Sequence, residues 1–265
     1  MASTYALNGE TRVFYIVGDP IAQVKSPASV TRTMTALGHN CVLVPMHVTP
    51  ADFDGFMAGA SLARNLDGII ATVPHKFAAY SRCATATDRA HFLGSANILR
   101  RNQDGGWHGD MSDGQGFVSG ILVAGCDPLG RRALVIGAGG AGSAIALALV
   151  EAGVIELAIH DTDIVRRDAL VARLKDRCAA VHAGSADPTG YTLVVNATTV
   201  GMRAGDPYPV QVDRLTSDMF VGEVITAPAV TPLIEAARRL GCATQVGGGM
   251  YDAQLDLMCD FLLGK

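Results

Sequence analysis

A glycine-rich hexapeptide, Gly137-Ala138-Gly139-Gly140-Ala141-Gly142, has the composition and spacing of a phosphate-binding turn. It follows an apolar run at residues 133–136 and precedes a segment of small and apolar residues, 143–150, with helical character. In a strand–turn–helix unit, the first glycine permits the tight turn, the second lets backbone approach a pyrophosphate, and the third allows close helix–strand packing. The free N–H groups of the helix N-terminus then face the phosphates. The pattern predicts a dinucleotide-binding loop rather than an ordinary glycine turn.

Asp161 decides which dinucleotide we expect. It ends the next apolar run, 24 residues after Gly137, where a carboxylate accepts hydrogen bonds from the adenosine ribose hydroxyls. The same carboxylate would repel a 2′-phosphate by up to ~4 kcal/mol at a separation of about 4 Å and an effective dielectric of ~20. A third of that energy is nearly tenfold in affinity. Arg166 and Arg167, one turn later, would offset part of it. The sequence therefore favours NAD over NADP, and the alternative is that Asp161 merely caps the following helix.

Lys76 is a candidate for the reaction itself, because it follows the buried-looking run 69–73 and Pro74. Oxidation of a secondary alcohol with a nicotinamide cofactor needs hydride transfer and removal of the hydroxyl proton, and Lys76 with Asp113 could manage that proton. A lysine pKa near ~10.4 must be lowered by desolvation before the amine can act as a base at pH 7. Otherwise Lys76 stays a cation that stabilises the alkoxide while water or Asp113 takes the proton. The alternative is structural, with Lys76 ending a strand and Asp113 beginning a helix.

Two successive series of alternating strands and helices would position these residues. Apolar runs at 13–17, 41–48 and 62–73 predict strands, with helices at 29–37 and from Thr49-Pro50 onward. Residues 98–112 are polar and turn-rich, which predicts a junction. After it, strands are expected around 133–136, 156–161, 192–198 and 219–225, with helices at 143–150, 164–177 and 231–241. Apolar residues at helical spacing predict a last helix over 251–263.

The composition fits a two-domain α/β protein. The chain has 265 residues, of which 49% are hydrophobic, 17% are charged and 30 are glycine, as expected for a large core with many tight turns. The net charge of −4 without a basic run argues against nucleic acid or an anionic membrane as partner. The six cysteines lie far apart without a CxxC pair, which predicts reduced core residues and no metal site.

Neither the start of the chain nor its most apolar stretch has the pattern of a membrane-targeting segment. The start lacks a basic region followed by an apolar run, so no signal peptide is expected. Residues 133–149 fit a buried strand, a glycine turn and a buried helix better than a membrane span. A cytoplasmic location is therefore expected.

Eight short motifs occur along the chain in an order that resembles the shikimate dehydrogenase family, including its quinate-oxidising branch. They are DPIAQVKSP (19–27), TVPHK (72–76), GSAN (94–97), GDMSDGQG (109–116), GAGGAG (137–142), NATTVGM (196–202), TP (231–232) and GGGMYDAQ (247–254). The resemblance runs from Gly18 to the C-terminal helix. It implies a substrate domain, residues 1–112 with a returning C-terminal helix at 250–265, and a Rossmann NAD-binding domain at 113–249. The family's substrate lies in the cleft between these two domains.

The resemblance also implies a role for individual residues. It makes Lys76 and Asp113 catalytic. The substrate-binding residues implied by it are Ser26, Thr72, Asn97 and Gln254, together with the altered positions Val24, Ile70 and Thr226. The cofactor-binding residues implied by it are Asp88, the glycine loop 137–142, Asp161, Asn196, Thr198, Val224, Gly247 and Met250.

The departures from the family pattern cluster around the substrate. Val24 replaces the first serine of the family's SKS motif, Ile70 replaces an asparagine, and Thr226 replaces a tyrosine. Each lost hydrogen bond to a charged group typically costs ~1.5–3 kcal/mol, so shikimate binding would weaken by orders of magnitude. Retained alcohol chemistry on an altered ring substrate is the natural inference. The family's NADP-binding asparagine–arginine–threonine run is Asp161-Thr162-Asp163 here, which adds to the expectation of NAD.

The function expected from the sequence is therefore dehydrogenation of shikimate, quinate or a related cyclic polyol acid, with the protein acting as a monomer or homodimer. Such an activity would belong to aromatic amino acid biosynthesis. The alternative is a catalytically weak, cofactor-dependent sensor or regulatory module on the same fold, which the changes at Val24, Ile70 and Thr226 motivate.

Overall fold

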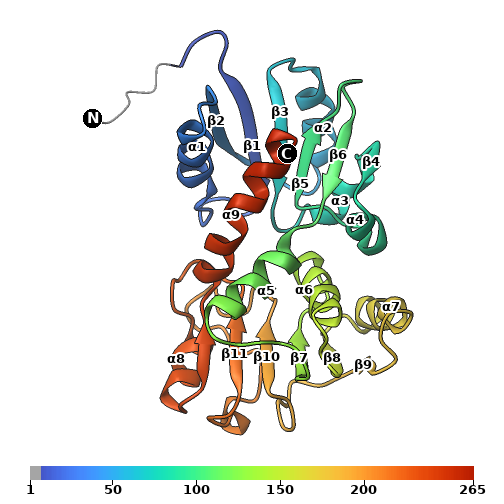
Figure 1. Ribbon diagram of the computed structural model, residues 1–265, viewed down its shortest axis with the longest axis vertical. Coiled ribbons are helices and arrows are strands. Elements are labelled where there is room, and N and C mark those ends of the chain that lie inside the picture. Colours follow the sequence, from blue (N-terminus) through green and yellow to red (C-terminus); the bar gives the residue numbers. More distant parts are fainter. Residues whose placement is uncertain (1–6) are drawn as a thin grey trace. The chain divides into compact units, whose positions relative to one another are not determined.

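The computed structural model describes residues 7–265, which form two compact units, each built around its own six-stranded sheet (Figure 1). The first unit contains the described residues up to Ser112 together with Leu255–Lys265, and the second contains Asp113–Gln254. Residues 1–6, which belong to the expected substrate domain and to the start searched for a signal peptide, lie outside the described residues. The expected α/β class with two sheets is confirmed.

The sheet of the first unit is mixed, with strand order β2-β1-β3-β5-β6-β4. Its strands are β1 (Arg12–Gly18), β2 (Cys41–His47), β3 (Leu66–Ala71), β4 (Thr85–Ala86), β5 (Ile98–Arg101) and β6 (Trp107–Asp110). Strand β1 runs parallel to β2 and β3, whereas β5 runs antiparallel to both β3 and β6. The prediction of a junction at 98–112 is wrong, because β5 and β6 form a hairpin inside this sheet.

Helices cover both faces of the first sheet. They are α1 (Ser26–Ala36), α2 (Phe53–Leu62), α3 (Lys76–Ser81), α4 (Asp88–Leu93) and the last part of α9 (Gly247–Leu263). Phe53 and Met57 of α2 pack into a core with Ile69. The opposite face meets α9, since a Cβ added to Gly68 would lie 2.5 Å from Leu262 Cδ2.

Four predicted helix starts are wrong, and two of them, those of α1 and α6, lie at Ser26 and Gly140, three residues before the expected 29 and 143. Helix α2 begins at Phe53 instead of Pro50, because residues 50–52 form a turn in which the Thr49 hydroxyl donates to the Asp52 carboxylate at 2.7 Å. Helix α9 begins at Gly247, four residues before the expected 251, so three consecutive glycines open it. Tertiary packing overrides the low helix propensity of glycine there, since a Cβ on Gly247 would lie 2.2 Å from the Ile225 carbonyl oxygen.

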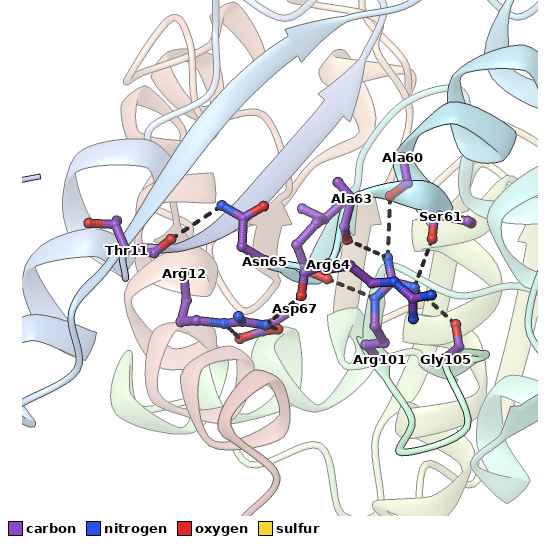
Figure 2. Close-up of polar contacts among 11 residues, drawn as sticks. Thr11, Arg12, Ala60, Ser61, Ala63, Arg64, Asn65, Asp67, Arg101 and Gly105 are labelled. Atoms are coloured by element: carbon purple, nitrogen blue, oxygen red, sulfur yellow. Dashed lines mark hydrogen bonds and ion pairs between the residues drawn. The ribbon is translucent and has the colours of Figure 1, made fainter. Parts of the chain in front are cut away.

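Arg101, at the end of β5, fastens the hairpin to α2 (Figure 2). Its guanidinium donates to the carbonyls of Ala60, Ser61 and Ala63 at 3.2–3.3 Å, which lie at the C-terminal end of α2. It also donates to Leu66 O at 2.8 Å and stacks over the Trp107 ring at 4.3 Å. One side chain thus satisfies the carbonyls that a helix end leaves without partners.

The second sheet is wholly parallel, with strand order β12-β11-β10-β7-β8-β9. Its strands are β7 (Arg132–Ile136), β8 (Glu156–His160), β9 (Val181–Ala183), β10 (Leu193–Asn196), β11 (Phe220–Glu223) and β12 (Ala243–Gln245). Counted from β9, the order is 3-2-1-4-5-6, the arrangement of a Rossmann fold. The strand order reverses between β7 and β10, so a dinucleotide would lie across the carboxyl ends at that point.

Helices sandwich the second sheet as well. They are α5 (Asp113–Val123), α6 (Gly140–Glu151), α7 (Ile164–Lys175), α8 (Pro232–Arg239) and a short 3₁₀ helix (Val212–Arg214). Leu233 and Ile234 of α8 share a core with Leu134 and Val194. On the other side α5 crosses α6 closely, since a Cβ on Gly114 would lie 2.2 Å from Ala144 O. Across residues 7–265, every helix is too short or too polar for a membrane crossing.

Candidate functional site

The carboxyl ends of β1 and β3 bring two of the predicted substrate loops together. Because these strands are parallel neighbours, their following loops start at the same edge of the sheet. The Thr72 N–H donates to Val17 O at 2.9 Å, and the Asp19 N–H donates to Val73 O at 2.9 Å. Gly18 is required at this crossing, since a Cβ there would lie 2.5 Å from Thr72 Cγ2. The loop that leads to Ser26 therefore starts beside the loop that carries Thr72 and Lys76.

Lys76 and Asn97 reach the same edge through main-chain hydrogen bonds. The Lys76 carbonyl accepts from the Ala96 N–H at 3.0 Å, and the Asn97 carbonyl accepts from the Ala71 N–H at 2.7 Å. Lys76 is half-buried as the first residue of α3, and Asn97 is buried. The first unit thus gathers Thr72, Lys76 and Asn97, three residues of the predicted set, around the end of β3.

His75 fixes the backbone just before Lys76, a role that the sequence did not indicate. Its ring is buried, stacks on Phe53 with 4.5 Å between the ring centroids, and hydrogen-bonds Val48 O through Nε2 at 2.7 Å. A histidine between a proline and a lysine gave no periodic signal of burial. Its contacts fix the turn from β3 into α3, and so the place from which the Lys76 side chain starts.

Buried polar contacts hold Asn97 in the first unit and Gln254 in the second. The Ser112 N–H donates to Asn97 Oδ1 at 2.9 Å, and Asn97 Nδ2 donates to Ser112 Oγ at 3.2 Å. The next residue, Asp113, begins α5 and accepts from Gln254 Nε2 at 2.9 Å. All four side chains are at least nine-tenths buried. Hydrogen bonds thus fix the Asn97 side chain within the first unit and the Asp113 side chain within the second, and the roles of both residues toward a substrate stay predictions.

The positions that depart from the family lie in contrasting surroundings. Val24 is half-buried and precedes α1, whose first residue is the buried Ser26. Ile70 is 5% exposed in β3, where its register partners are Ile16 and Ile98. Thr226 is half-buried in the segment after β11. Val24 and Thr226 are thus in loops at strand and helix ends, whereas Ile70 lies between isoleucines of the two neighbouring strands, β1 and β5.

The glycine loop has the conformation that a dinucleotide phosphate group requires. Gly137 adopts φ +104°, and its N–H donates to His160 O at 2.7 Å. A Cβ on Gly142 would lie 1.9 Å from Gly137 O, so only glycine fits there. Around Gly139 a Cβ would meet nothing within 4 Å, and no side chain caps α6 at its N-terminus. The open approach and the uncapped N–H groups fit an anion such as a pyrophosphate.

Asp161 is turned toward the glycine loop and toward Arg166. Its carboxylate accepts from the Ala138 N–H at 2.7 Å, from the Asp163 N–H at 2.8 Å, and from Arg166 Nη2 at 3.0 and 3.2 Å. Burial alone would raise the pKa of Asp161, but these hydrogen bonds outweigh it and hold the pKa below its usual value. The helix that follows is capped by Asp163, which accepts from the Arg166 N–H at 3.0 Å.

The remaining predicted cofactor-binding residues of the second unit lie at or near the ends of β10 and β11. Asn196 is fully buried, and its Oδ1 accepts from the Thr198 N–H at 3.1 Å and the Thr198 hydroxyl at 2.7 Å. Gly247 packs against the segment that contains Val224, and Met250 follows it in the first turn of α9. Two of these residues, Asn196 and Val224, donate hydrogen bonds to Glu223, a buried residue that the sequence did not single out. A glutamate inside the apolar run MFVGEVI was the available signal.

Asp88 is the one predicted cofactor-binding residue that belongs to the first unit. It is the exposed first residue of α4, next to the capping Thr87, whose hydroxyl accepts from the Ala90 N–H at 3.4 Å. A carboxylate in the first turn interacts favourably with the helix dipole, which accounts for an acidic residue here. A cofactor contact by Asp88 stays a prediction.

Comparison with known proteins gives a consistent result. The family model described as shikimate dehydrogenase substrate binding domain matches residues 16–99. The chain is 35% identical to shikimate dehydrogenase (NADP(+)) of Rubrobacter xylanophilus over 91% of this chain and 87% of that protein. It is 33% identical to shikimate dehydrogenase (NADP(+)) of Acidiphilium cryptum, over 92% and 87%.

Solved structures extend the comparison. Quinate dehydrogenase from Corynebacterium glutamicum, in complex with NAD, superposes with a TM-score of 0.84 at 28% identity, covering 96% of this chain and 94% of that one. A 5-ketofructose reductase of a Gluconobacter strain superposes with a TM-score of 0.82 at 26% identity, covering 97% and 95%.

The expectation of NAD in preference to NADP is contradicted by the curated relatives, which are named as NADP(+)-dependent enzymes. The physical reason lies in the Asp161 carboxylate. The expected repulsion allowed Arg166 and Arg167 only a partial offset, whereas the Asp161 oxygens are occupied by two backbone N–H groups and paired directly with the Arg166 guanidinium. That ion pair removes most of the repulsion and leaves a cation at the edge of the loop.

The family follows from the length and level of the match. The identity of 35% extends over nine-tenths of the chain, and the motif order and the Rossmann strand order agree with it. The chain belongs to the shikimate dehydrogenase family and is an oxidoreductase of the shikimate and quinate dehydrogenase type.

Proposed function

We propose that the protein interconverts a secondary alcohol and a ketone on shikimate, quinate or a related cyclic hydroxy acid, with NADP as cofactor. The observation that carries the proposal is the joint placement of Thr72, Lys76 and Asn97 at the end of β3, in a chain related to shikimate dehydrogenases over nearly its whole length. The glycine loop fits the pyrophosphate of the dinucleotide. When bound, the cofactor supplies the hydride acceptor or donor.

Lys76 is the residue we assign to the reacting oxygen. In one mechanism its amine accepts the hydroxyl proton, and in the other its ammonium stabilises the alkoxide while Asp113 or water accepts the proton. Asp113 is positioned for either by Gln254, which donates to its Oδ1 at 2.9 Å. Asp113→Asn tests whether Asp113 is the proton acceptor, because only that form of the second mechanism loses its acceptor, whereas the first mechanism and the water-assisted form tolerate a neutral amide at this position.

Arg166 is the residue we assign to the 2′-phosphate of NADP. Its guanidinium already lies at the mouth of the glycine loop, where Asp161 holds it at 3.0 Å. Nearly half of the side chain is exposed, so further N–H donors face solvent. A guanidinium offers five donors in a planar fork that matches phosphate oxygens.

The test is turnover with a panel of substrates. Shikimate and quinate are offered with NADP+ and with NAD+, and their ketone forms with the reduced cofactors, to the wild type and to Lys76→Ala. We expect turnover with at least one cyclic hydroxy acid, faster with NADP, and its loss in the variant. Turnover that survives Lys76→Ala would overturn the assignment of Lys76. Tight NADP binding without turnover on any member would favour the sensor.

A second substrate class is suggested by Val24 and by the similarity to 5-ketofructose reductase. Val24 offers no hydrogen bond where the family pattern has a serine, so recognition of a carboxylate there is weaker. A polyhydroxy ketone without a carboxylate would not need that contact. The panel therefore includes 5-ketofructose. Val24→Ser should improve the KM of a carboxylate substrate by about tenfold or more and leave that of the uncharged ketone unchanged. Ala22→Ser, exposed in the same loop, is the matched control.

A further inference from the structure

Glu223, the last residue of β11, is a buried carboxylate surrounded by neutral donors. Its side chain is 1% exposed. Oε1 accepts from the N–H groups of Val224 at 2.8 Å and Ile225 at 3.1 Å, and Oε2 accepts from the Thr231 hydroxyl at 3.0 Å. Asn196 Nδ2 donates to both oxygens, at 3.1 and 3.0 Å. Every donor is a neutral amide or hydroxyl.

These bonds join three segments that are distant in the chain. Asn196 ends β10 and shapes the turn that follows, through its bonds to Thr198 and to the Val200 carbonyl, which accepts from Nδ2 at 3.1 Å. Val224 and Ile225 begin the segment after β11. Thr231 caps α8, where it accepts from the Ile234 N–H at 3.3 Å. One carboxylate therefore sets the ends of two adjacent strands and the start of a helix.

The location of this cluster is what gives it a consequence for function. In a 3-2-1-4-5-6 sheet, the adenosine half of a dinucleotide lies over strands 1 to 3 and the nicotinamide half over strands 4 to 6. Strands β10 and β11 are the fourth and fifth. The buried Glu223 side chain fixes the backbone at the carboxyl ends of these two strands. Its effect on a ligand is therefore indirect, through the position of that backbone.

A purely structural role does not require a carboxylate. Burying this charge without a cationic partner is costly, and burial raises the pKa of Glu223 to about 7 even though four donors oppose the shift. A glutamate does offer something that a neutral side chain does not, namely two oxygens that only accept. The N–H groups of Asn196, Val224 and Ile225 donate to Oε1, and the Thr231 hydroxyl donates to Oε2, so the site uses both oxygens as acceptors and only a carboxylate supplies both.

We propose that Glu223 is a positioning residue for the proposed reaction, fixing the Asn196–Thr198 turn and the Val224–Ile225 segment so that the nicotinamide half of NADP meets a preformed surface. The inference rests on the proposed function. It assigns to Glu223 no contact with cofactor or substrate, and it predicts that the residue acts on cofactor affinity and on the pH at which that affinity is reached.

The titration of Glu223 should be visible in cofactor binding. The groups facing it are Asn196 from β10, Val224 and Ile225 from its own segment, and Thr231 from α8, none of which titrates. A protonated carboxyl needs an acceptor, and only the Thr231 hydroxyl can serve, so protonation disturbs the bonds that hold the cluster. Affinity for NADPH should weaken as the pH falls through about 7.

The experiment measures dissociation constants of NADPH by fluorescence and calorimetry between pH 5.5 and 8.5. The variants are Glu223→Ala, Glu223→Gln and Glu223→Asp, with Glu235→Gln, exposed on α8, as matched control. We expect Glu223→Ala to raise the dissociation constant at pH 8 by about tenfold or more, since misplacing groups by about 1 Å can cost 10²-fold. Glu223→Gln, which keeps most acceptor contacts, should lose only a few-fold and should lose the pH dependence near 7. Glu235→Gln should match the wild type.

The outcomes separate this inference from the proposed function. A folded Glu223→Ala with wild-type affinity, or a Glu223→Gln with the wild-type pH dependence, would overturn the role of Glu223 while wild-type binding and turnover stand. If Glu223→Ala does not fold, the Glu223→Gln pH profile decides alone. A wild type that binds no NADPH would overturn the proposed function, and the inference with it.

Discussion

The carboxyl edges of the two sheets are held in order by different means. In the first unit, main-chain hydrogen bonds hold the loops that follow β1 and β3, as in the bonds from Thr72 N–H to Val17 O and from Ala96 N–H to Lys76 O. In the second, buried carboxylates organise the loops: Asp161 holds the glycine loop, and Glu223 holds the ends of β10 and β11. Hydrogen bonds between main-chain groups persist when a side chain is replaced, and they do not depend on pH. Hydrogen bonds to a buried carboxylate are lost when that side chain is replaced, and they change when it is protonated.

The largest expected effect is a loss of kcat on substitution of Lys76, at the carboxyl edge of the first sheet. Lys76→Met should lower kcat by roughly 10²–10⁴-fold, the usual contribution of a group that manages a proton. The melting temperature and the NADPH dissociation constant should stay near wild type, because the bond from Ala96 N–H to the Lys76 carbonyl survives the substitution. Steady-state kinetics and thermal unfolding measure this, with the exposed Lys175→Met as control. A marked fall in the melting temperature of Lys76→Met would mean that the carboxyl edge of the first sheet also depends on side chains.

The next effect concerns Glu223 and stability. Its pKa rises from 4.5 in the unfolded chain to about 7 in the folded protein, so the folded state binds the proton more tightly. The resulting stabilisation is complete below pH 4.5 and is lost as pH rises through about 7, an amplitude of about 3 kcal/mol. The free energy of unfolding of wild type minus that of Glu223→Gln, measured by denaturant titration between pH 4.5 and 8, should show this fall. A difference that does not vary with pH would contradict it.

Asp161 should have the opposite dependence. Its pKa is lowered on folding, so its stabilisation is present above the unfolded value of 3.8 and is lost as pH falls through the folded pKa. Asp161→Asn should cost about 1.5–3 kcal/mol at pH 7, the range for hydrogen bonds to a charged group. Asp163→Asn is the matched control in the same loop, since asparagine caps a helix as well as aspartate does. Equal losses in the two variants would deny Asp161 its organising role.

The smallest expected effect is on the choice of cofactor. Arg166→Ala should weaken NADPH binding by about tenfold, about 1.4 kcal/mol, and NADH binding by less, because it removes a phosphate partner and leaves Asp161 without its cation. Fluorescence titration with both cofactors gives the ratio. Arg173→Ala, two turns further along α7, should leave the ratio unchanged. An unchanged ratio in Arg166→Ala would assign the 2′-phosphate to another group.

The elements that could be predicted were those whose signal is local. Apolar runs predict β1, β2 and β3, and the glycine spacing predicts the β7–α6 turn. The hairpin of β5 and β6 could not be predicted, because Arg100 and Arg101 give β5 a polar sequence. Residues 98–101 form a strand because they pair with β3, which no local pattern indicates. The start of α9 in a run of glycines depends on packing against Ile225, which the sequence does not display.

The same division holds for the site. Lys76, Asn97 and Asp113 were found because short motifs in a fixed order mark them. The partnership of Asp161 with Arg166, and the burial of Glu223 among neutral donors, depend on which residues meet in space. The mistaken preference for NAD arose there, since the charge of Asp161 and a partial offset by Arg166 could be predicted from the chain, but the direct ion pair and the backbone N–H bonds that complete the neutralisation could not.

The Gly68–Leu262 contact bears on how the protein is made. Leu262 belongs to the last residues of the first unit, Leu255–Lys265, which leave the ribosome only after the whole of the second unit. At 5–20 residues per second, the stretch from Asp113 onward takes roughly 8–30 s to synthesise. During that interval β3 lacks the helix that covers Gly68, whereas the second unit is contiguous up to Gln254 and emerges complete. The unit that is translated first is thus the last to obtain its full core.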